Sequence, residues 1–580
     1  MTIQEKFPSI RPSLNLDFAN TKTLDPRVTF SRASTATYYD GKTVAKAEEN
    51  LLLYSQEFDK AQWSKTGATI TSDAAVAPDG TTTADALIET TAADLHVAFR
   101  AAIQLNVSLT LSVWVKANGR TFALLGNTDH AISVNLTTGV ASSTQGSPAN
   151  IFSVSAGNGW YRIGFTASFF GGNTFSVYAS QDGLFANRSY TGDGTSGIYI
   201  WGAQLEQRSS VTAYTPTTNQ PITNYIPVLR TAAANVARFD HNPVTGESLG
   251  LLIEEQRTNL LRRSQEFISP SPWAIQGATV VNNATVALDG SQTAALLVAN
   301  LGYVYNDNSA SVLSQFITLT GGTTYTWSIY AKAAGVGSLA IRNNWTGGIT
   351  IYNLTDELTT ANKQFIGNGW YRCFVTYTPS STSTNGFSWR PFVSGGTADG
   401  VGGVLLWGAQ LEAGAFPTSY IKTEASQVTR SADAASMTGA NFSSWFRADA
   451  GSIMSEAYSF SGLVATPRVV SIQEATPTTL NQAVIGADVM RVRVNGSDIG
   501  SFFTSQTISG KYTLAYSEGS NAGSKNGVVQ SSSNAGLPRN LVAMYIGQSS
   551  AMLASLNGHI RKIAYYPARL TNTQLQALTT

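Results

Sequence analysis

The chain has 580 residues, enough for several domains that each bury their own core. Only 13% of the residues are charged and the net charge is +1, so no general field draws this chain to nucleic acid or to an acidic surface. A single cysteine excludes an intrachain disulfide, and the lack of any run of about 18 apolar residues argues against a membrane-spanning helix. Residues 1–10 have no apolar core, so we expect no secretory signal.

Residues 1–49 have no counterpart elsewhere in the chain and form a lead-in. Pro8 and Pro12 argue against a helix, whereas residues 14–18 alternate between apolar and polar as a strand does. The segment is either an irregular stretch packed on the next domain or an N-terminal arm that anchors the chain to a partner subunit. We carry the arm forward as the prediction.

Residues 50–222 and 259–425 are two copies of one domain. Gly-Asn-Gly-Trp-Tyr-Arg stands at 157–162 and 367–372, and Trp-Gly-Ala-Gln-Leu-Glu stands at 201–206 and 407–412. A repeat of this length is a duplicated domain and not a solenoid unit.

Within each copy, short strand-like segments follow one another without a helical crossover. Residues 109–116 and 325–332 alternate strictly between the two faces of a predicted strand. Asn158-Gly159, inside the repeated hexapeptide, suits the positive φ angles of a tight hairpin. We therefore expect antiparallel sheets, for which a two-sheet sandwich or jelly roll is the economical arrangement.

The two remaining segments are the connector 223–258 and the C-terminal part 426–580. The connector contains a turn rich in Pro and Gly and then a short predicted strand. The C-terminal part matches neither copy and contains several apolar β-type runs. Thr571 and Gln574 have capping-box spacing, which predicts one short terminal helix. We expect a second kind of β-sandwich here, and an all-β chain as a whole.

The repeated signature runs from Asn-Leu-Leu through Asn-Gly-Trp-Tyr-Arg to Gly-Ala-Gln-Leu-Glu. It resembles carbohydrate-binding-module-like jelly rolls in structural proteins of tailed bacteriophages. Residues 16–20, 32–38, 235–240 and 251–255 look like parts of the same proteins, and residues 558–567 are similar to the last strands of phage laminin-G-like or concanavalin-like domains. The resemblance implies two tandem jelly-roll β-sandwiches followed by a C-terminal laminin-G-like β-sandwich.

Catalytic chemistry has little support in the sequence. Glycan hydrolysis usually needs two carboxylates about 5–10 Å apart, but the acidic residues are scattered and many stand in Asp-Gly turns. The four histidines lack the spacing of zinc ligands. A calcium site at residues 305–308 would have a single carboxylate, so we interpret that segment as a polar loop. We predict no enzyme activity, no metal and no cofactor.

The aromatic residues give the candidate binding site. Tryptophans present in both copies, such as Trp160 and Trp370, are interpreted as core. Trp345 and Trp389 have no counterpart in the first copy, and Trp389 precedes Arg390. An exposed aromatic ring beside Asn or Arg suits the apolar face of a sugar and its hydroxyl groups, so Trp345, Trp389 and Arg390 are the candidate glycan contacts.

We therefore predict a non-enzymatic bacteriophage virion protein, made in the host cytoplasm, that binds host surface glycan from a tail fibre, tail tip or head spike. One alternative is a capsid or collar fibre, or a decoration protein, without a specific receptor. Another is a glycan depolymerase. The expected partners are other virion proteins, through the N-terminal arm, and host cell-surface polysaccharide. The resemblance implies a homo-oligomer, commonly a trimer, although no heptad segment is visible.

Overall fold

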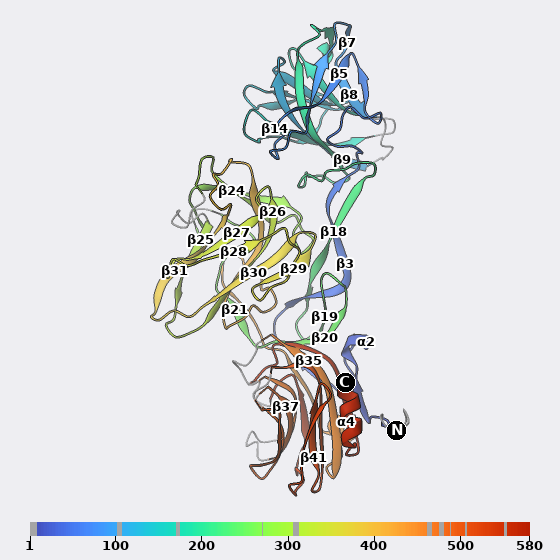
Figure 1. Cartoon of the computed structure of the whole chain (residues 1–580), viewed down its shortest axis with the longest axis vertical. Helices are drawn as coiled ribbons and strands as arrows, with labels where there is room; N and C mark the ends of the chain where they lie inside the picture. The colour runs from blue at the N-terminus through green and yellow to red at the C-terminus, as the bar shows by residue number, and fades with distance from the viewer. Residues whose placement is uncertain are drawn as a thin grey trace.

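The computed structural model describes residues 8–100, 107–169, 174–268, 271–304, 313–460, 467–474, 481–487, 489–504, 507–549 and 554–580. The described chain is all-β, which confirms the predicted fold class: antiparallel sheets dominate and the few helices are short. Figure 1 shows three lobes along the long axis, namely the first module, the second module and the C-terminal sandwich. A two-stranded ribbon runs beside the second module to reach the first.

The first module is a jelly-roll sandwich with one core between its two main sheets. One sheet has the order β12 (Ala141–Gln145), β11 (Ala131–Asn135), β10 (Phe122–Gly126), β15 (Phe175–Ser180), β8 (Val97–Arg100) and β4 (Ser64–Thr66). The other has the order β13 (Ala149–Ser155), β14 (Tyr161–Phe169), β9 (Val107–Asn118), β17 (Gly197–Glu206), β6 (Ala84–Glu89) and β5 (Ala68–Ala75). A small sheet pairs β16 (Ser189–Thr191) with β7 (Ala93–Leu95), after the 3-10 turn η1 (Phe185–Asn187).

The second module repeats this arrangement around its own core. One sheet has the order β22 (Ala274–Ile275), β25 (Leu313–Leu319), β31 (Ser383–Pro391), β27 (Ser338–Asn343) and β28 (Ile349–Asn353). The other has the order β23 (Ala278–Thr285), β24 (Ala294–Ala299), β32 (Gly403–Ala413), β26 (Tyr325–Ala334), β30 (Trp370–Tyr377) and β29 (Lys363–Gly367). A short pair, β21 (Arg257–Asn259) and β33 (Val428–Arg430), lies where the chain enters and leaves the module.

The ribbon consists of β3 (Ala36–Asn50) and β18 (Ile222–Ala232), which lead into and out of the first module. An isolated two-stranded ribbon is only marginally stable in water. Here one of its faces packs on the second module, where Tyr39 and Ile226 share a buried cluster with Tyr330 and Trp407. The second module therefore supports the connection to the first.

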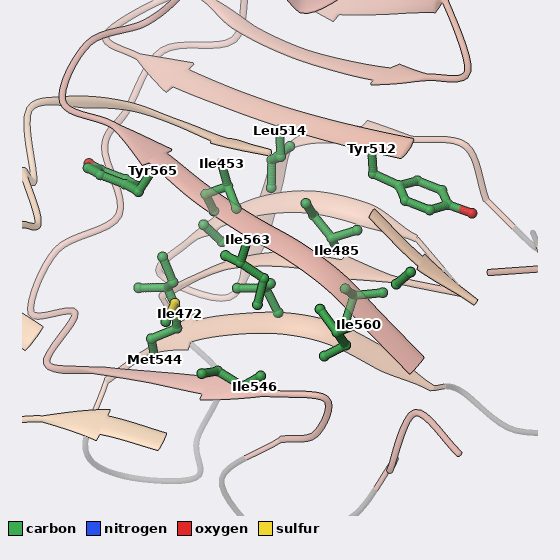
Figure 2. Close-up of a cluster of buried hydrophobic side chains, with 14 of the residues drawn as sticks. Ile453, Ile472, Ile485, Tyr512, Leu514, Met544, Ile546, Ile560, Ile563 and Tyr565 are labelled. Carbon is green, nitrogen blue, oxygen red and sulfur yellow. The ribbon is translucent and has the colours of Figure 1, made fainter. Parts of the chain in front are cut away.

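The C-terminal sandwich has two large sheets. One has the order β19 (Arg238–His241), β20 (Ser248–Ile253), β44 (Gly558–Tyr566), β35 (Ala450–Ser459), β40 (Ser509–Ser517), β41 (Asn521–Lys525) and β42 (Val528–Ser532), with β1 (Leu14–Leu16) also paired to β44. The other has the order β2 (Thr29–Ser31), β34 (Ala434–Thr438), β43 (Ala543–Ile546), β36 (Arg468–Gln473), β37 (Gln482–Gly486), β38 (Met490–Val494) and β39 (Ser497–Phe502). Figure 2 shows their shared core, in which Ile453 and Ile563 of the first sheet lie with Ile472 and Ile485 of the second.

This sandwich corrects the predicted division of the chain into a 1–49 arm, a 223–258 connector and a 426–580 domain. β1 pairs with β44, β2 pairs with β34, and β20 extends the sheet beyond β44. Each added strand supplies partners for backbone N–H and C=O groups that an open sheet edge would leave unpaired. The described lead-in is thus divided between the C-terminal sandwich and the ribbon and does not form a free arm.

A buried ion cluster joins these distant segments. Asp433 binds Arg32 at 3.0 Å and Arg238 at 2.5 Å, and Glu254 binds Arg238 at 2.8 Å and Arg430 at 3.5 Å. All five side chains are at most 1% exposed. Burial opposes ionisation of Glu254, but the neighbouring arginines outweigh it and hold the pKa of that carboxyl well below its usual range. Segments 32–38 and 251–255 therefore help to hold the second module and the C-terminal sandwich together.

Two local predictions are confirmed. Asn158 and Gly159 have φ angles of 50° and 80° in the hairpin between β13 and β14. Thr571 caps helix α4 (Asn572–Thr579) in a capping box with Gln574. The other named helices are short, α2 (Phe18–Thr21) and α3 (Ala440–Ser443).

Candidate functional site

Two of the three predicted glycan contacts lie inside the second module. Trp389 is 0% exposed on β31, and its ring lies 5.4 Å from that of Trp273 and 5.3 Å from that of Trp327. Arg390 follows it and is 1% exposed. The prediction that these two residues contact glycan is therefore wrong. Trp389 has no tryptophan counterpart because the first module fills the same part of its core with the smaller Val177.

Trp345 is half-buried at the rim of the second module. Its indole Nε1 donates to Ser383 Oγ at 2.9 Å, and its ring packs beside Tyr377 and Phe387. A role for Trp345 in glycan binding stays a prediction. The segment 305–308, weighed above as a calcium site, lies outside the described residues. Within the described ranges, no group of three or more His, Cys, Asp or Glu side chains could hold a metal ion, and no helix there is long and apolar enough to cross a membrane.

A different aromatic cluster lies on the outer face of the first module. The alternation along β9 points Val113 and Val115 into the core, so that Trp114 and Lys116 face away from it. Trp114 meets Trp201 and Tyr214 at ring-centroid distances of 5.1 Å each, in edge-to-face geometry that aromatic pairs favour. We name Trp114, Trp160, Trp201 and Tyr214 the first cluster.

Hydrogen bonds and the positively charged Arg162 side chain hold the first cluster in place. The Arg162 guanidinium lies 4.4 Å from the Trp114 ring centroid and donates to Thr212 O and Ser112 Oγ. Burial lowers the pKa of Arg162 to about 10, which leaves it protonated at neutral pH. Trp201 Nε1 donates to Thr83 Oγ1 at 3.0 Å. The rings are therefore held in one arrangement before any ligand arrives.

The duplication places an equivalent set in the second module, which we name the second cluster: Tyr330, Trp370, Trp407 and Tyr420. Trp407 Nε1 donates to Thr293 as Trp201 does to Thr83, and Arg372 lies 5.3 Å from the Tyr330 ring as Arg162 lies over Trp114. The four rings and Arg372 are at most 7% exposed.

The ribbon covers the second cluster but not the first. A methyl group added at Gly290, beside the second cluster, would lie 3.5 Å from Ala45 of the ribbon. At the equivalent Gly80, beside the first cluster, it would meet no atom within 4 Å. Tyr214 is correspondingly half-buried, whereas its counterpart Tyr420 is only 2% exposed.

The space left over the first cluster is a cleft of about 1310 Å³ between the two modules. The four rings of the first cluster line one side, and Leu405 with Asp399, Val401 and Gly402 of the second module line the other. Polar side chains from both modules and the ribbon surround it: Glu48, Asp79, Lys116, Asn158, Arg162 and Lys332. An apolar surface with a few convergent polar groups is the usual composition of a ligand site.

The sequence did not predict this cleft, although Trp160 and Trp201, which line it, are among the repeated tryptophans. The rule that a tryptophan kept in both copies is core correctly anticipates that Trp160 and Trp201 are 2% and 4% exposed. It does not reveal that they lie on the outer face of a sheet. The alternation of residues 109–116 was the available signal, because it sets Trp114 opposite the core-facing Val113.

Comparisons with known proteins do not assign a family. No family model matches the chain, and no curated protein matches it. Among solved structures, the tandem CBM22-1-CBM22-2 domain of Paenibacillus barcinonensis Xyn10C shares 13% identity, covering 64% of this chain and 99% of that one, with a TM-score of 0.18. A single-residue mutant of Bacillus subtilis oxalate decarboxylase OxdC shares 10% identity, covering 64% and 81%, with a TM-score of 0.09. Likenesses with such low TM-scores identify neither a ligand nor a relative.

Proposed function

We propose that this chain is a non-enzymatic attachment protein of a bacteriophage virion, and that its first module binds host surface glycan in the cleft between the modules. One observation carries the binding role: the same aromatic cluster is built twice, and only the copy in the first module opens onto a cleft. Trp160 and Trp201 are buried, so the half-buried Tyr214 and the 9% exposed edge of Trp114 offer the apolar surface to a sugar ring. The surrounding Lys, Asn and Asp side chains suit its hydroxyl groups.

The virion assignment rests on the sequence segments that resemble tailed-phage proteins. Many copies on one particle would raise the effective concentration, so a weak site in each copy would suffice for attachment. Assembly with other virion proteins and into a homo-oligomer, commonly a trimer, belongs to the same proposal. Localisation in the virion follows from it.

The state of Glu48, a carboxylate of the cleft, supports binding without hydrolysis. Glu48 accepts from Lys332 Nζ at 2.7 Å and from Asn368 Nδ2 at 2.8 Å. Burial alone would raise the pKa of Glu48, but these partners outweigh it and hold the pKa below its usual value. A glycosidase acid needs the opposite shift, because it must carry a proton near neutral pH.

A structural fibre without a receptor is the second candidate, and the second cluster favours it. That cluster serves only to seat the ribbon, so the first could be an unused copy of the same packing surface. A side chain that obstructs the cleft should weaken glycan binding by an attachment protein and should change nothing in a structural fibre without a receptor.

The test is binding of the full-length protein to host cells, with soluble surface polysaccharide as competitor. Val76 is 57% exposed on the cleft wall, so Val76→Trp should obstruct the cleft and weaken binding at least tenfold. Val140→Trp is the matched control, because Val140 is 65% exposed in the same module and away from the cleft. Unchanged binding by Val76→Trp, or no saturable binding by the parent protein, would favour the structural fibre. Release of reducing sugar ends from the polysaccharide would favour a depolymerase.

A further inference from the structure

The two modules carry the same pair of hydrogen-bond donors next to their aromatic clusters. Lys332 and Asn368 of the second module correspond to Lys116 and Asn158 of the first. The lysine stems lie alike against their hairpins: a methyl group at Gly369 would be 3.4 Å from Lys332 Cε, and one at Gly159 would be 3.7 Å from Lys116 Cε. The lysine stem therefore takes the same position against its hairpin in the two halves of the chain.

In the second module this pair holds a carboxylate. Glu48 of the ribbon places Oε1 at 2.7 Å from Lys332 Nζ and Oε2 at 2.8 Å from Asn368 Nδ2. The carboxylate is bridged by one charged donor and one amide donor, and Glu48 and Lys332 also line the cleft. Charge-assisted hydrogen bonds of this kind are short and strong.

In the first module the same pair faces the cleft without a carboxylate. Within the described ranges, neither the Lys116 ammonium nor the Asn158 side-chain amide has a hydrogen bond or ion pair. The nearby acids are engaged elsewhere: Asp79 accepts from Thr81, and Asp399 accepts from the backbone N–H groups of its own turn. The second module thus shows that a carboxylate binds between a lysine and an asparagine placed in this way.

We infer that the cleft recognises a carboxylate-bearing glycan, with the carboxylate bridged between Lys116 Nζ and Asn158 Nδ2 and the sugar rings over the first cluster. This inference rests on the proposed function and names the ligand class of that same site.

The second module itself contacts the hairpin of the first module at the point where the ribbon contacts the equivalent hairpin. In the second module the ribbon passes over the hairpin at Gly367, where an added methyl group would lie 3.6 Å from Pro227. At the equivalent Gly157 of the first module, the methyl group would lie 3.4 Å from Val401 of the second module. The path of a second ribbon is therefore already occupied, while a cleft of about 1310 Å³ remains open beside it.

The experiment measures binding of the full-length protein to alginate, polygalacturonate and hyaluronan, and to the carboxyl-reduced form of each. We expect acidic polysaccharide to bind at least tenfold more tightly than its carboxyl-reduced form. Lys116→Met, which keeps the apolar stem, and Asn158→Gly, which suits the φ of 50°, should each remove most of that preference. Lys42→Met changes an exposed lysine away from the cleft and should have no effect.

The possible results separate this inference from the proposed function. Equal binding of acidic and reduced polysaccharide, or an undiminished preference in folded Lys116→Met and Asn158→Gly, would overturn the carboxylate inference and leave glycan binding in place. Binding of poly-L-glutamate as tight as that of the best acidic polysaccharide would make an acidic polypeptide the occupant and would also overturn it. Binding neither to these polysaccharides nor to the host surface polysaccharide would contradict the proposed function itself.

Discussion

Replacing Asp433 by Asn should loosen the junction at which the lobes meet. Asp433 accepts from Arg32 and Arg238 in a site where all three side chains are 0% exposed. Breaking a buried ion pair by removing one partner typically costs about 3–5 kcal/mol, because the remaining charge is left buried and uncompensated. Arg32 loses its carboxylate partner here, whereas Arg238 keeps Glu254, so we expect a loss within that range, about 3–5 kcal/mol.

That loss is a large part of the stability of a domain, which is commonly about 5–15 kcal/mol. Urea unfolding followed by tryptophan fluorescence would measure it, and hydrogen exchange would locate it. Faster exchange is expected in β19 and β20, whose sheet edge adjoins the ion cluster, and not in the distant first module.

The matched control is Asp449→Asn. Asp449 pairs with Arg447 at 2.6 Å, but both side chains are more than half exposed, and exposed pairs contribute little to stability. If the two substitutions destabilise the protein equally, the buried cluster does not hold the junction and the reasoning fails.

Four other outcomes are expected. Trp389→Ala should lower the free energy of unfolding by about 3–5 kcal/mol. Trp345→Ala should lower it clearly less because Trp345 is half-buried, and denaturant unfolding of both variants would show the difference. A 426–580 fragment should fail to melt cooperatively because β1, β2, β19 and β20 are missing, and cooperative melting would contradict the assigned sheets. Gly159→Val should lower the melting temperature of the first module, because a β-branched residue resists a φ of 80°, and an unchanged melt would count against that turn. Burial raises the pKa of Asp85 to about 6. The free energy of unfolding should therefore fall by up to about 3 kcal/mol as pH rises from about 4 through 6 and Asp85 ionises. Asp85→Asn should remove that slope from the pH profile, and an unaltered slope would refute the assignment.

Local features of the fold were predictable from the sequence. The hairpin at Asn158-Gly159 and the capping box at Thr571 depend on neighbouring residues only, so a short stretch specifies them. The duplication made the sandwich prediction stronger, because two independent copies show the same alternation. The buried position of Trp160 followed from its presence in both copies.

Long-range pairing and the cleft were not predictable. The three residues of β1 carry no signal that their partner is β44, more than five hundred residues away, since any open edge can accept a short apolar strand. The cleft depends on how two modules pack, and on a ribbon that covers the second cluster alone. The prediction for Trp389 was wrong for another reason. A residue without a counterpart in the other copy marks either a ligand contact or a core that is filled differently, and the sequence does not distinguish the two.

The most direct test of the binding site is hydroxyl-radical footprinting of the full-length protein, with and without the host surface polysaccharide that competes for cell binding. The account predicts that polysaccharide protects Val76, Lys116 and Tyr214, while the ribbon-covered second cluster is unchanged. Protection confined to other surfaces, such as the rim around Trp345, would contradict it.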